Sequence, residues 1–258
     1  MEEETWKTAI TKVEPNKVCL RGYRIDELMG RITYAQGVFL AIKGELPSQG
    51  EAQMLDAILV SSIDHGVTPP SCVAARTLAS TGNPLNAALA GGILAISRHH
   101  GGAIEDSMRL LQEAVRRKNE MKATSRQIAS ITVKEYAGKH RRLPGFGHRI
   151  HTRDPRTPKL FQIASDLGIA GEYVEMAEAL QDAIRESTGK ELPINVDGAI
   201  AAVLCEMDFP PELANAFFIM ARVPGLVAHV YEEKKRMKPM RHINPRTHEY
   251  DGTPERNL

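Results

Sequence analysis

Apolar residues along most of the chain recur every three or four positions, the spacing that places them on one face of a helix. Met54, Leu55 and Ile58 repeat in this way after Ser48, which forms a capping box with Glu51. The alternation of apolar and polar residues that is typical of a half-buried strand is nearly absent. The pattern predicts an all-α fold.

Capping residues mark the ends of other expected helices. Thr124 and Gln127 form a second capping box, and Asp26 and Thr33 are expected to cap two short helices. Pro158 is expected at the first position of a helix, where the fixed φ of proline is favourable. Further helices are expected over residues 171–188, 195–207 and 211–237.

The segment Pro84–Ile96 is apolar on nearly every side, as expected of a helix at the centre of a bundle. It is too short to span a bilayer, and the acidic N-terminus lacks the apolar core of a signal peptide. Cys19, Cys72 and Cys205 are far apart and odd in number, which indicates a reducing compartment and no disulfide framework. These features favour a soluble, cytoplasmic protein without a membrane segment.

The charges balance over the whole chain, with 33 Lys+Arg against 32 Asp+Glu and a formal net charge of +1. No overall field draws such a chain to nucleic acid or to an anionic membrane, and neither partner is expected. Residues 139–156, KHRRLPGFGHRIHTRDPR, are a local exception, because Asp154 is the one acid among many Lys, Arg and His. This stretch is expected to face a small anionic molecule.

A Pro-Gly-Phe-Gly turn, Pro144–Gly147, lies at the centre of the basic stretch. Proline and glycine break a helix, so the turn places His148 on a bend. An imidazole ringed by positive charge suits proton transfer next to a polyanionic ligand. The alternative is a solvated basic loop, and His140 and His151 are interpreted as solvated members of the stretch.

Four more clusters lie at breaks between helices: Asp64-His65-Gly66, Arg98–Ala103, Asn195–Gly198 and Arg222–Gly225. Taken singly, His65 and His100 could each end a helix, and Asp197 could stabilise a helix dipole. Arg222 is harder to explain in this way, because it lies in an apolar run and needs an anionic partner.

Together the clusters indicate carbon–carbon bond chemistry next to a carbonyl. A carboxylate can move a proton alpha to a thioester, one His can stabilise the enol oxygen, and a second His can exchange a proton with the partner's oxygen. Arginines can clamp the substrate carboxylates. Ser-dependent hydrolysis is disfavoured because no Ser lies on a nucleophile-elbow pattern. No metal site is expected, because HxxxH spacing with a nearby acid is missing.

Eight motifs follow one another in an order that resembles the citrate synthase superfamily, over nearly the whole chain. They are RGYRIDEL (21–28), KGELP (43–47), DHG (64–66), HGGA (100–103), PGFGHR (144–149), DPR (154–156), NVD (195–197) and ARVPGLVAH (221–229). The resemblance implies an α-helical homodimer with a large and a small domain that close over oxaloacetate and acetyl-CoA. We expect residues 1–102 and 201–258 to form the large domain and residues 103–200 the small one.

The resemblance also implies roles for single residues. His100 corresponds to the histidine that stabilises the enol, His148 to the one that exchanges a proton with the oxaloacetate-derived oxygen, and Asp197 to the general base at the acetyl methyl. The residues implied in dicarboxylate binding are His65, Arg156 and Arg222. Those implied in CoA binding are Arg142, Pro144, Gly145, Phe146 and Gly147.

Two departures from full-length synthases resemble the compact citryl-CoA lyases and the C-terminal module of ATP-citrate lyase. The N-terminal helical segment of the synthases is lacking before RGY, and Met240–Arg246 stands in place of an RPR-like tail motif. His100 is present, whereas the ATP-citrate lyase module has another residue before its Gly-Gly. We therefore expect a citryl-CoA lyase that forms acetyl-CoA and oxaloacetate from (3S)-citryl-CoA, with no cofactor beyond the substrate's own coenzyme A. The alternatives are a compact citrate synthase and a non-catalytic CoA-binding regulatory subunit.

The tail after Pro239 has no helical period and is expected to dock on a partner subunit. A tricarboxylate needs more cations than Arg156 and Arg222 supply, so Arg241 is expected to bind substrate in the neighbouring subunit, with Arg246 as the competing candidate. The apolar helix at residues 85–96, together with Phe217–Met220, offers more hydrophobic surface than a monomer readily hides. An isologous homodimer is therefore expected.

Overall fold

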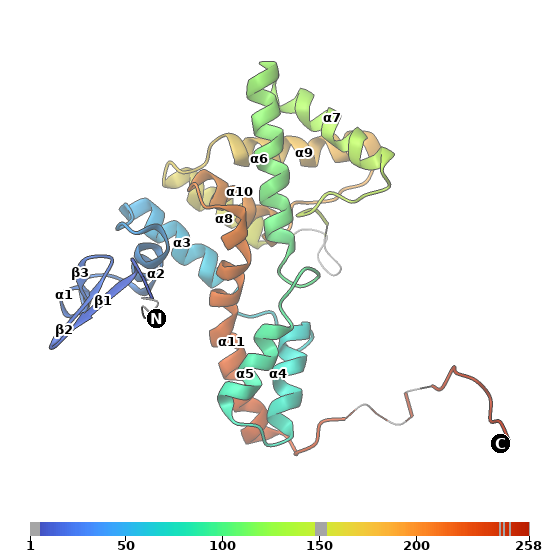
Figure 1. The fold of residues 1–258 in the computed structure, drawn as a ribbon. Coiled ribbons are helices and arrows are strands. Elements are labelled where there is room, and N and C mark those ends of the chain that lie inside the picture. Colours follow the sequence, from blue (N-terminus) through green and yellow to red (C-terminus); the bar gives the residue numbers. More distant parts are fainter. Residues whose placement is uncertain (1–5, 148–153, 243, 245, 248, 258) are drawn as a thin grey trace, which may run out of the picture. The chain divides into compact units, whose positions relative to one another are not determined.

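The computed structural model describes residues 6–147, 154–242, 244, 246–247 and 249–257, and most of these are helical (Figure 1). The α-helices are α1 (Ile25–Leu28), α2 (Tyr34–Lys43), α3 (Gln49–Ser61), α4 (Pro70–Ser80), α5 (Leu85–Leu94), α6 (Ala103–Met121), α7 (Ser125–Gly138), α8 (Arg156–Asp166), α9 (Glu172–Thr188), α10 (Val196–Glu206) and α11 (Ala214–Arg236). A short 3-10 turn, Pro211–Leu213, precedes α11. The prediction of a mainly helical chain is confirmed.

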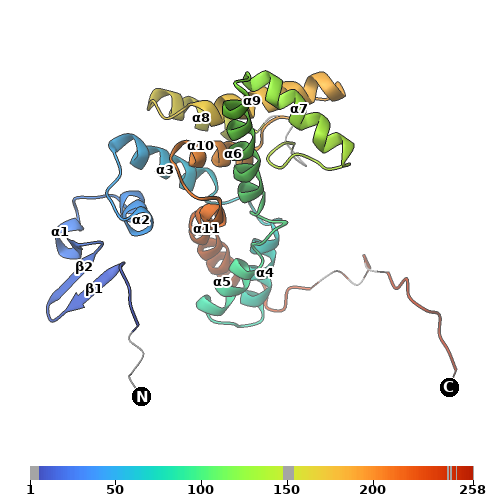
Figure 2. The same ribbon diagram turned by 45° about the horizontal axis from the view of Figure 1, so that its top comes forward.

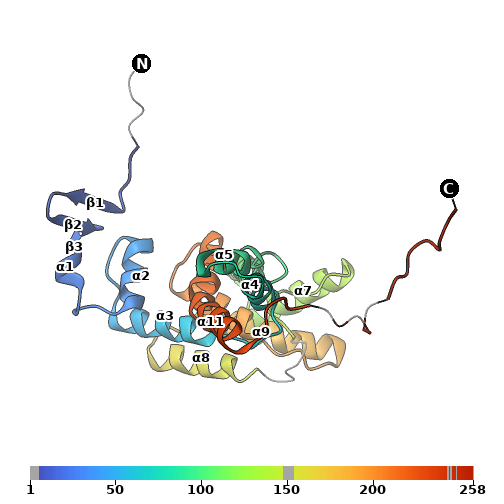
Figure 3. The ribbon, with the colours of Figure 1, turned by 90° about the horizontal axis from the view of Figure 1, so that it is seen from below.

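A small antiparallel sheet near the N-terminus was not predicted. It contains β1 (Thr11–Glu14), β2 (Lys17–Leu20) and β3 (Tyr23–Arg24), in that order (Figure 3). Strands of two to four residues are too short to show a clear alternation, although the turn at Pro15 and Asn16 is a hairpin signal. The prediction of Asp26 as a helix cap is wrong, because Arg24 holds that position and Asp26 lies in the first turn of α1.

Three predicted N-caps are confirmed. The hydroxyls of Thr33, Ser48 and Thr124 each accept a hydrogen bond from the backbone three residues later, and each capping box is complete. The prediction for Pro158 is wrong, because α8 begins at Arg156. The backbone N–H of Arg156 donates to the Asp154 carboxylate at 3.0 Å, which fixes an earlier start.

Contacts divide the chain into two compact units. The first contains residues 1–63 and 97–222, and the second contains residues 64–96 and 223–258. In the first unit α10 packs against α6, α8 and α9, and α7 lies along α9 (Figure 2). Nine of the eleven residues of α10 are buried, so this helix forms the centre of that unit. The predicted large and small domains stay a prediction.

The second unit has a small core between α4, α5 and the C-terminal part of α11. Its buried members are Cys72, Ala75, Ala79, Ala88, Leu226 and Val230. The prediction that residues 84–96 form a central, surrounded helix is wrong for this chain, because α5 buries only Ala88 and Gly92. Leu85 and Leu94 are 46% and 82% exposed.

The helix α11 contributes to both units, which divide between Arg222 and Val223. Together with the preceding 3-10 turn it is long and apolar enough to cross a membrane, by length and composition alone. Core helices pass the same test, and Phe217, Leu226 and Val230 of α11 are buried within the chain.

Candidate active site

Asp197 lies in the first turn of the buried helix α10. The side-chain oxygen of Asn195 caps this helix by accepting from the backbone N–H of Gly198 at 3.1 Å. Burial raises the pKa of Asp197 from 3.8 to about 6, although Arg156 and Arg222 act in the opposite direction. A carboxyl group with this pKa can donate or accept a proton near neutral pH.

Arg156 and Arg222 are both anchored at the C-terminal end of α3. A guanidinium N–H of Arg156 donates to the Ser61 carbonyl at 3.3 Å, and Nε of Arg222 donates to the Ser62 carbonyl at 2.9 Å. Cations are favourable at this position, because the last carbonyls of a helix carry partial negative charge. Two guanidinium groups are thus held on neighbouring residues, within electrostatic range of Asp197.

Asp154 orients Arg156 by a bidentate ion pair. Nε and Nη2 of Arg156 lie 3.0 Å and 2.8 Å from the two carboxylate oxygens of Asp154, which is buried. Such a fork restricts the rotation of the guanidinium. The charge of Asp154 also contributes to the raised pKa of Asp197.

His100 lies in a tight turn before α6. Its backbone N–H donates to the Ser97 carbonyl at 2.8 Å, and the next residue, Gly101, has a φ of 92° that favours glycine. The imidazole packs edge-on against Phe218, with ring centroids 5.4 Å apart. The guanidinium of Arg222 lies over the same ring, 4.7 Å from its centroid. Phe218 therefore holds His100 and Arg222 beside each other.

The Pro144–Gly147 turn is joined to the segment that leads into α10. Gly147 N donates to the Pro193 carbonyl at 2.8 Å, and Asn195 N donates to the Gly145 carbonyl at 3.0 Å. Gly145 has a φ of 84°, and a Cβ on it would lie 2.8 Å from the Cα of Gly198. The turn and the start of α10 thus approach each other backbone to backbone.

Asn195 connects both parts of this site. Its side-chain oxygen caps α10, and its Nδ2 donates to the Gly147 carbonyl at 2.8 Å. Gly147 directly precedes His148, and Asp197 follows Asn195 by two residues. His148 itself lies outside the described residues.

A cavity of about 690 Å³ lies beside the turn. Its lining is mostly apolar and includes Leu143, Phe146, Ile184 and Leu192, with Gly147 at the turn. Its cationic residues are Arg141, Arg142 and Lys190. Arg142 also lines a smaller charged pocket of about 340 Å³, together with Pro144 and residues of α6 and α7.

The first compact unit contains the Pro144–Gly147 turn and five other predicted site residues: His100, Arg142, Arg156, Asp197 and Arg222. His65 and Arg241 belong to the second unit. There His65 is half-buried in the turn after α3, and Arg241 forms an ion pair with Glu233 of its own chain at 2.6 Å. The reach of Arg241 into a partner subunit stays a prediction.

Several residues around the site were not predicted from the sequence. Asp154 could have been found by its position two residues before Arg156, and Arg141 by its place in the basic stretch. Phe218 could have been found by its spacing, because it lies one helical turn before Arg222 on α11. Lys190 has no local signal, because it is far in sequence from the Pro144–Gly147 turn. No cluster of three or more His, Cys, Asp or Glu arranged for a metal ion occurs among the residues that the structure describes.

Residues 48–246 match the family described as citrate synthase, C-terminal domain. The chain is 30% identical over 216 residues to a citrate synthase from Heyndrickxia coagulans, covering 81% of this chain and 55% of that protein. It thus spans about half the length of the curated relatives that it matches.

Two solved structures extend this comparison. The citryl-CoA lyase from Hydrogenobacter thermophilus is 46% identical, with a TM-score of 0.90 over 99% of this chain and 98% of that one. An ATP citrate lyase from Methanosaeta concilii in complex with (3S)-citryl-CoA is 20% identical, with a TM-score of 0.84 over 99% of this chain and 43% of that one, and shares the fold. This chain belongs to the citrate synthase family.

Proposed function

We propose that this chain is a citryl-CoA lyase, which cleaves (3S)-citryl-CoA to acetyl-CoA and oxaloacetate. The observation that carries the proposal is the 46% identity to the Hydrogenobacter thermophilus lyase, a chain of nearly the same extent. The arrangement of Asp197 near Arg156 and Arg222 supports it, because it supplies an acid–base group next to carboxylate-binding cations.

The cleavage needs three proton-handling groups. His148 removes the proton from the citryl hydroxyl, and the carbon–carbon bond breaks as the carbonyl of oxaloacetate forms. The bonding electron pair passes to the thioester enolate, whose oxygen accepts a hydrogen bond from His100. Asp197 then protonates the enolate carbon to give acetyl-CoA. Its pKa of about 6 leaves part of it protonated near neutral pH, as this step requires.

The oxaloacetate part of the substrate carries carboxylates that need cationic partners. Arg156 and Arg222 are anchored on Ser61 and Ser62 and supply two guanidinium groups in the first unit. His65 contributes a further contact, and Arg241 of a partner subunit is proposed to complete the set.

The cavity beside the Pro144–Gly147 turn is the proposed site for coenzyme A. Its apolar lining suits the adenine and pantetheine, and Arg141, Arg142 and Lys190 suit the phosphates. The reaction as written uses only side-chain acids and bases, so we propose that it needs no metal or redox cofactor. A chelator is then expected to leave the rate unchanged.

A homodimer is proposed because apolar side chains of the second unit face outward. Val73, Leu85 and Leu94, on α4 and α5, are 47%, 46% and 82% exposed. Light scattering at micromolar concentration should show a dimer, and Leu94→Ser should shift it toward the monomer. A stable monomer of the unaltered chain would contradict the proposal.

A compact citrate synthase is the second candidate, because curated synthases are among the relatives. A product assay separates the two. The purified chain should release oxaloacetate from citryl-CoA, measured by its reduction with NADH and malate dehydrogenase. A synthase would instead release free thiol from acetyl-CoA plus oxaloacetate with little cleavage of citryl-CoA. A protein that binds coenzyme A but performs neither reaction would be a regulatory subunit.

A further inference from the structure

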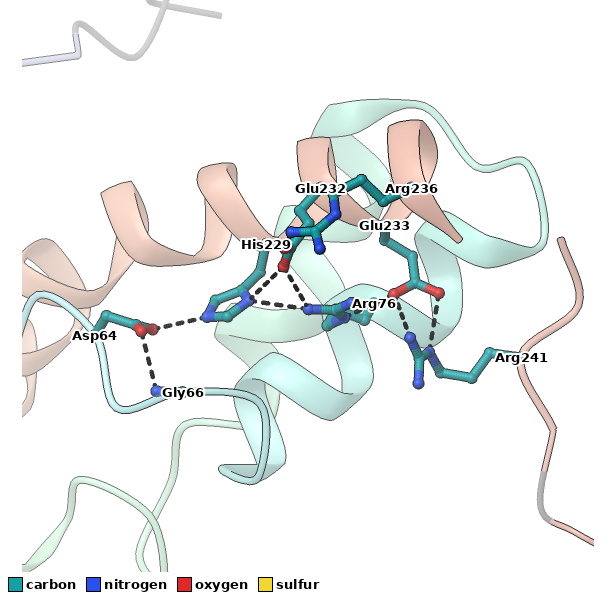
Figure 4. Close-up of polar contacts among 8 residues, drawn as sticks. All are labelled: Asp64, Gly66, Arg76, His229, Glu232, Glu233, Arg236 and Arg241. Carbon is teal, nitrogen blue, oxygen red and sulfur yellow. Dashed lines mark hydrogen bonds and ion pairs between the residues drawn. The ribbon is translucent and has the colours of Figure 1, made fainter. Parts of the chain in front are cut away.

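A line of charged side chains begins at the Asp64–Gly66 turn and crosses the second unit to Arg241 (Figure 4). Asp64 lies in the turn, Arg76 on α4, and His229 and Glu233 on α11. Arg76 and Glu233 are 4% and 2% exposed, and Nε of Arg76 lies 2.7 Å from the Glu233 carboxylate. Buried charges of this kind are retained only when paired, so these contacts constrain each side chain.

The contacts of His229 fix its tautomer. Its Nδ1 lies 3.2 Å from Nη1 of Arg76 and 4.0 Å from a carboxylate oxygen of Glu232, which is beyond hydrogen-bond distance. A guanidinium can only donate, so Nδ1 accepts from Arg76. The proton of the neutral imidazole is then on Nε2, which lies 3.0 Å from a carboxylate oxygen of Asp64. His229 therefore donates to Asp64, and Arg76 sets the direction of that bond.

Asp64 in turn shapes the backbone around His65. Its second carboxylate oxygen accepts from the N–H of Gly66 at 3.0 Å. Burial alone would raise the pKa of Asp64, but the N–H groups of Gly66 and His65 and the contact with His229 lower it. One carboxylate thus holds the turn on both sides of His65, and His229 ties that carboxylate to α11.

We propose that His229 and Arg76 are positioning residues for His65. They hold the Asp64 carboxylate, and through it the backbone of the His65 turn, in the geometry that binds the dicarboxylate end of the substrate. This inference rests on the proposed function, which gives His65 its role. It extends that function by naming two residues that need not touch the substrate.

The test compares oxaloacetate binding in three variants of the full chain by calorimetry. His229→Leu removes the donor to Asp64 and should weaken oxaloacetate binding by about tenfold to a hundredfold, the effect of one lost hydrogen bond to a charged group. His229→Gln keeps a donor and should recover part of the loss. Coenzyme A binding should change less than about twofold, because its proposed cavity is lined by residues of the first unit.

Leu226→Ala is the matched control, because Leu226 is a buried core residue of the same unit on the same helix as His229. It should lower the unfolding temperature at least as much as His229→Leu and leave oxaloacetate affinity nearly unchanged. Equal losses of affinity in Leu226→Ala and His229→Leu would reduce His229 to a stabilising role and overturn the inference.

Two further measurements keep the inference separate from the proposed function. In a His65→Ala background, His229→Leu should have little additional effect on oxaloacetate binding, and additive losses would count against positioning. In NMR spectra without substrate, the imidazole signals of His65 should shift in His229→Leu and not in Leu226→Ala. If the unaltered chain cleaves no citryl-CoA, the proposed function is wrong. Separately, if the NMR signals of His65 do not shift in His229→Leu, the inference that His229 positions His65 is wrong.

Discussion

The helices α5 and α10 are both almost wholly apolar in sequence, yet they have opposite surroundings. α10 buries nine of its eleven residues among α6, α8 and α9, whereas α5 buries only Ala88 and Gly92. α10 also carries an acidic residue near each end. Asp197 lies within electrostatic range of Arg156 and Arg222, and Glu206 accepts hydrogen bonds from the backbone at the start of α9. Apolar composition therefore indicates that a helix must pack against other segments. It does not indicate whether those segments belong to the same chain.

The difference follows from what each unit offers. In the first unit α6, α8 and α9 pack around α10, so the apolar surface of α10 is buried within the chain on all sides. The second unit contains α4, α5 and part of α11, which cannot enclose a central helix. The outward leucines of α5 are then the expected consequence, and they support the proposed dimer.

The largest expected effect is on turnover and comes from the first acid of α10. Asp197→Asn keeps the shape of the side chain but replaces the acid–base carboxyl group with an amide. Citryl-CoA cleavage should therefore slow by about 10²–10⁴-fold, with little change in substrate affinity. Steady-state kinetics with the purified variant measure this. Asp208→Asn, at an exposed acid just after α10, is the control and should keep nearly full activity. Near-normal turnover in Asp197→Asn would exclude it from the mechanism.

The second prediction compares packing in the two helices directly. Leu204 of α10 is fully buried, so Leu204→Ala should lower the free energy of unfolding by about 2–5 kcal/mol. Leu94 of α5 is 82% exposed, so Leu94→Ala should cost less than about 1 kcal/mol in dilute protein. Urea unfolding measures both values. A cost for Leu94→Ala that grows with protein concentration would place α5 in a subunit interface.

The third prediction concerns the pH dependence of stability. The folded chain keeps the Asp197 proton up to a pKa of about 6, whereas the unfolded chain releases it near 3.8. Stability from this group is therefore present below 3.8 and is lost as the pH rises through about 6. At about pH 7, Asp197→Asn should be more stable than the unaltered chain, by on the order of 1–3 kcal/mol.

Thermal unfolding across the pH range tests this linkage. The advantage of Asp197→Asn should shrink toward zero as the pH falls to the ordinary pKa of an aspartate. A stabilisation that stays constant over this range would mean that burial of the Asp197 charge does not determine it.

Local features of the fold could be predicted from the sequence, and features that depend on distant segments could not. The capping boxes at Ser48 and Thr124 were recognised because each involves residues three apart. The four-residue strands were too short for their alternation to be seen, and the exposure of α5 depends on what the rest of the chain supplies. Helix α6 was not predicted, although its sequence is amphipathic.

The same division holds for the candidate site. The motifs contained His100, Asp197 and Arg222, but no local pattern shows that Arg222 would be anchored on the Ser62 carbonyl. That contact joins residues 160 positions apart. No contact between the tail and its own chain was predicted from the sequence. In the structure Met240 N donates to the Ser80 carbonyl at 2.9 Å within the second unit.

The last prediction concerns a modest effect on stability, from the acid at the end of α10. One carboxylate oxygen of Glu206 accepts from the backbone N–H groups of Gly171, Tyr173 and Val174, at 2.8, 2.9 and 2.9 Å. It therefore supplies the cap and the negative charge that the first turn of α9 needs, in place of a side chain at Gly171.

Glu206→Gln keeps a carbonyl acceptor and loses the charge, so it should lower the free energy of unfolding by about 1 kcal/mol. Glu206→Ala leaves three N–H groups without this acceptor and should cost about 1–3 kcal/mol. Urea unfolding at two salt concentrations measures both, with the exposed Glu191→Gln as the control. Equal costs for Gln and Ala would show that the charge rather than the hydrogen bonds holds α9 to the end of α10.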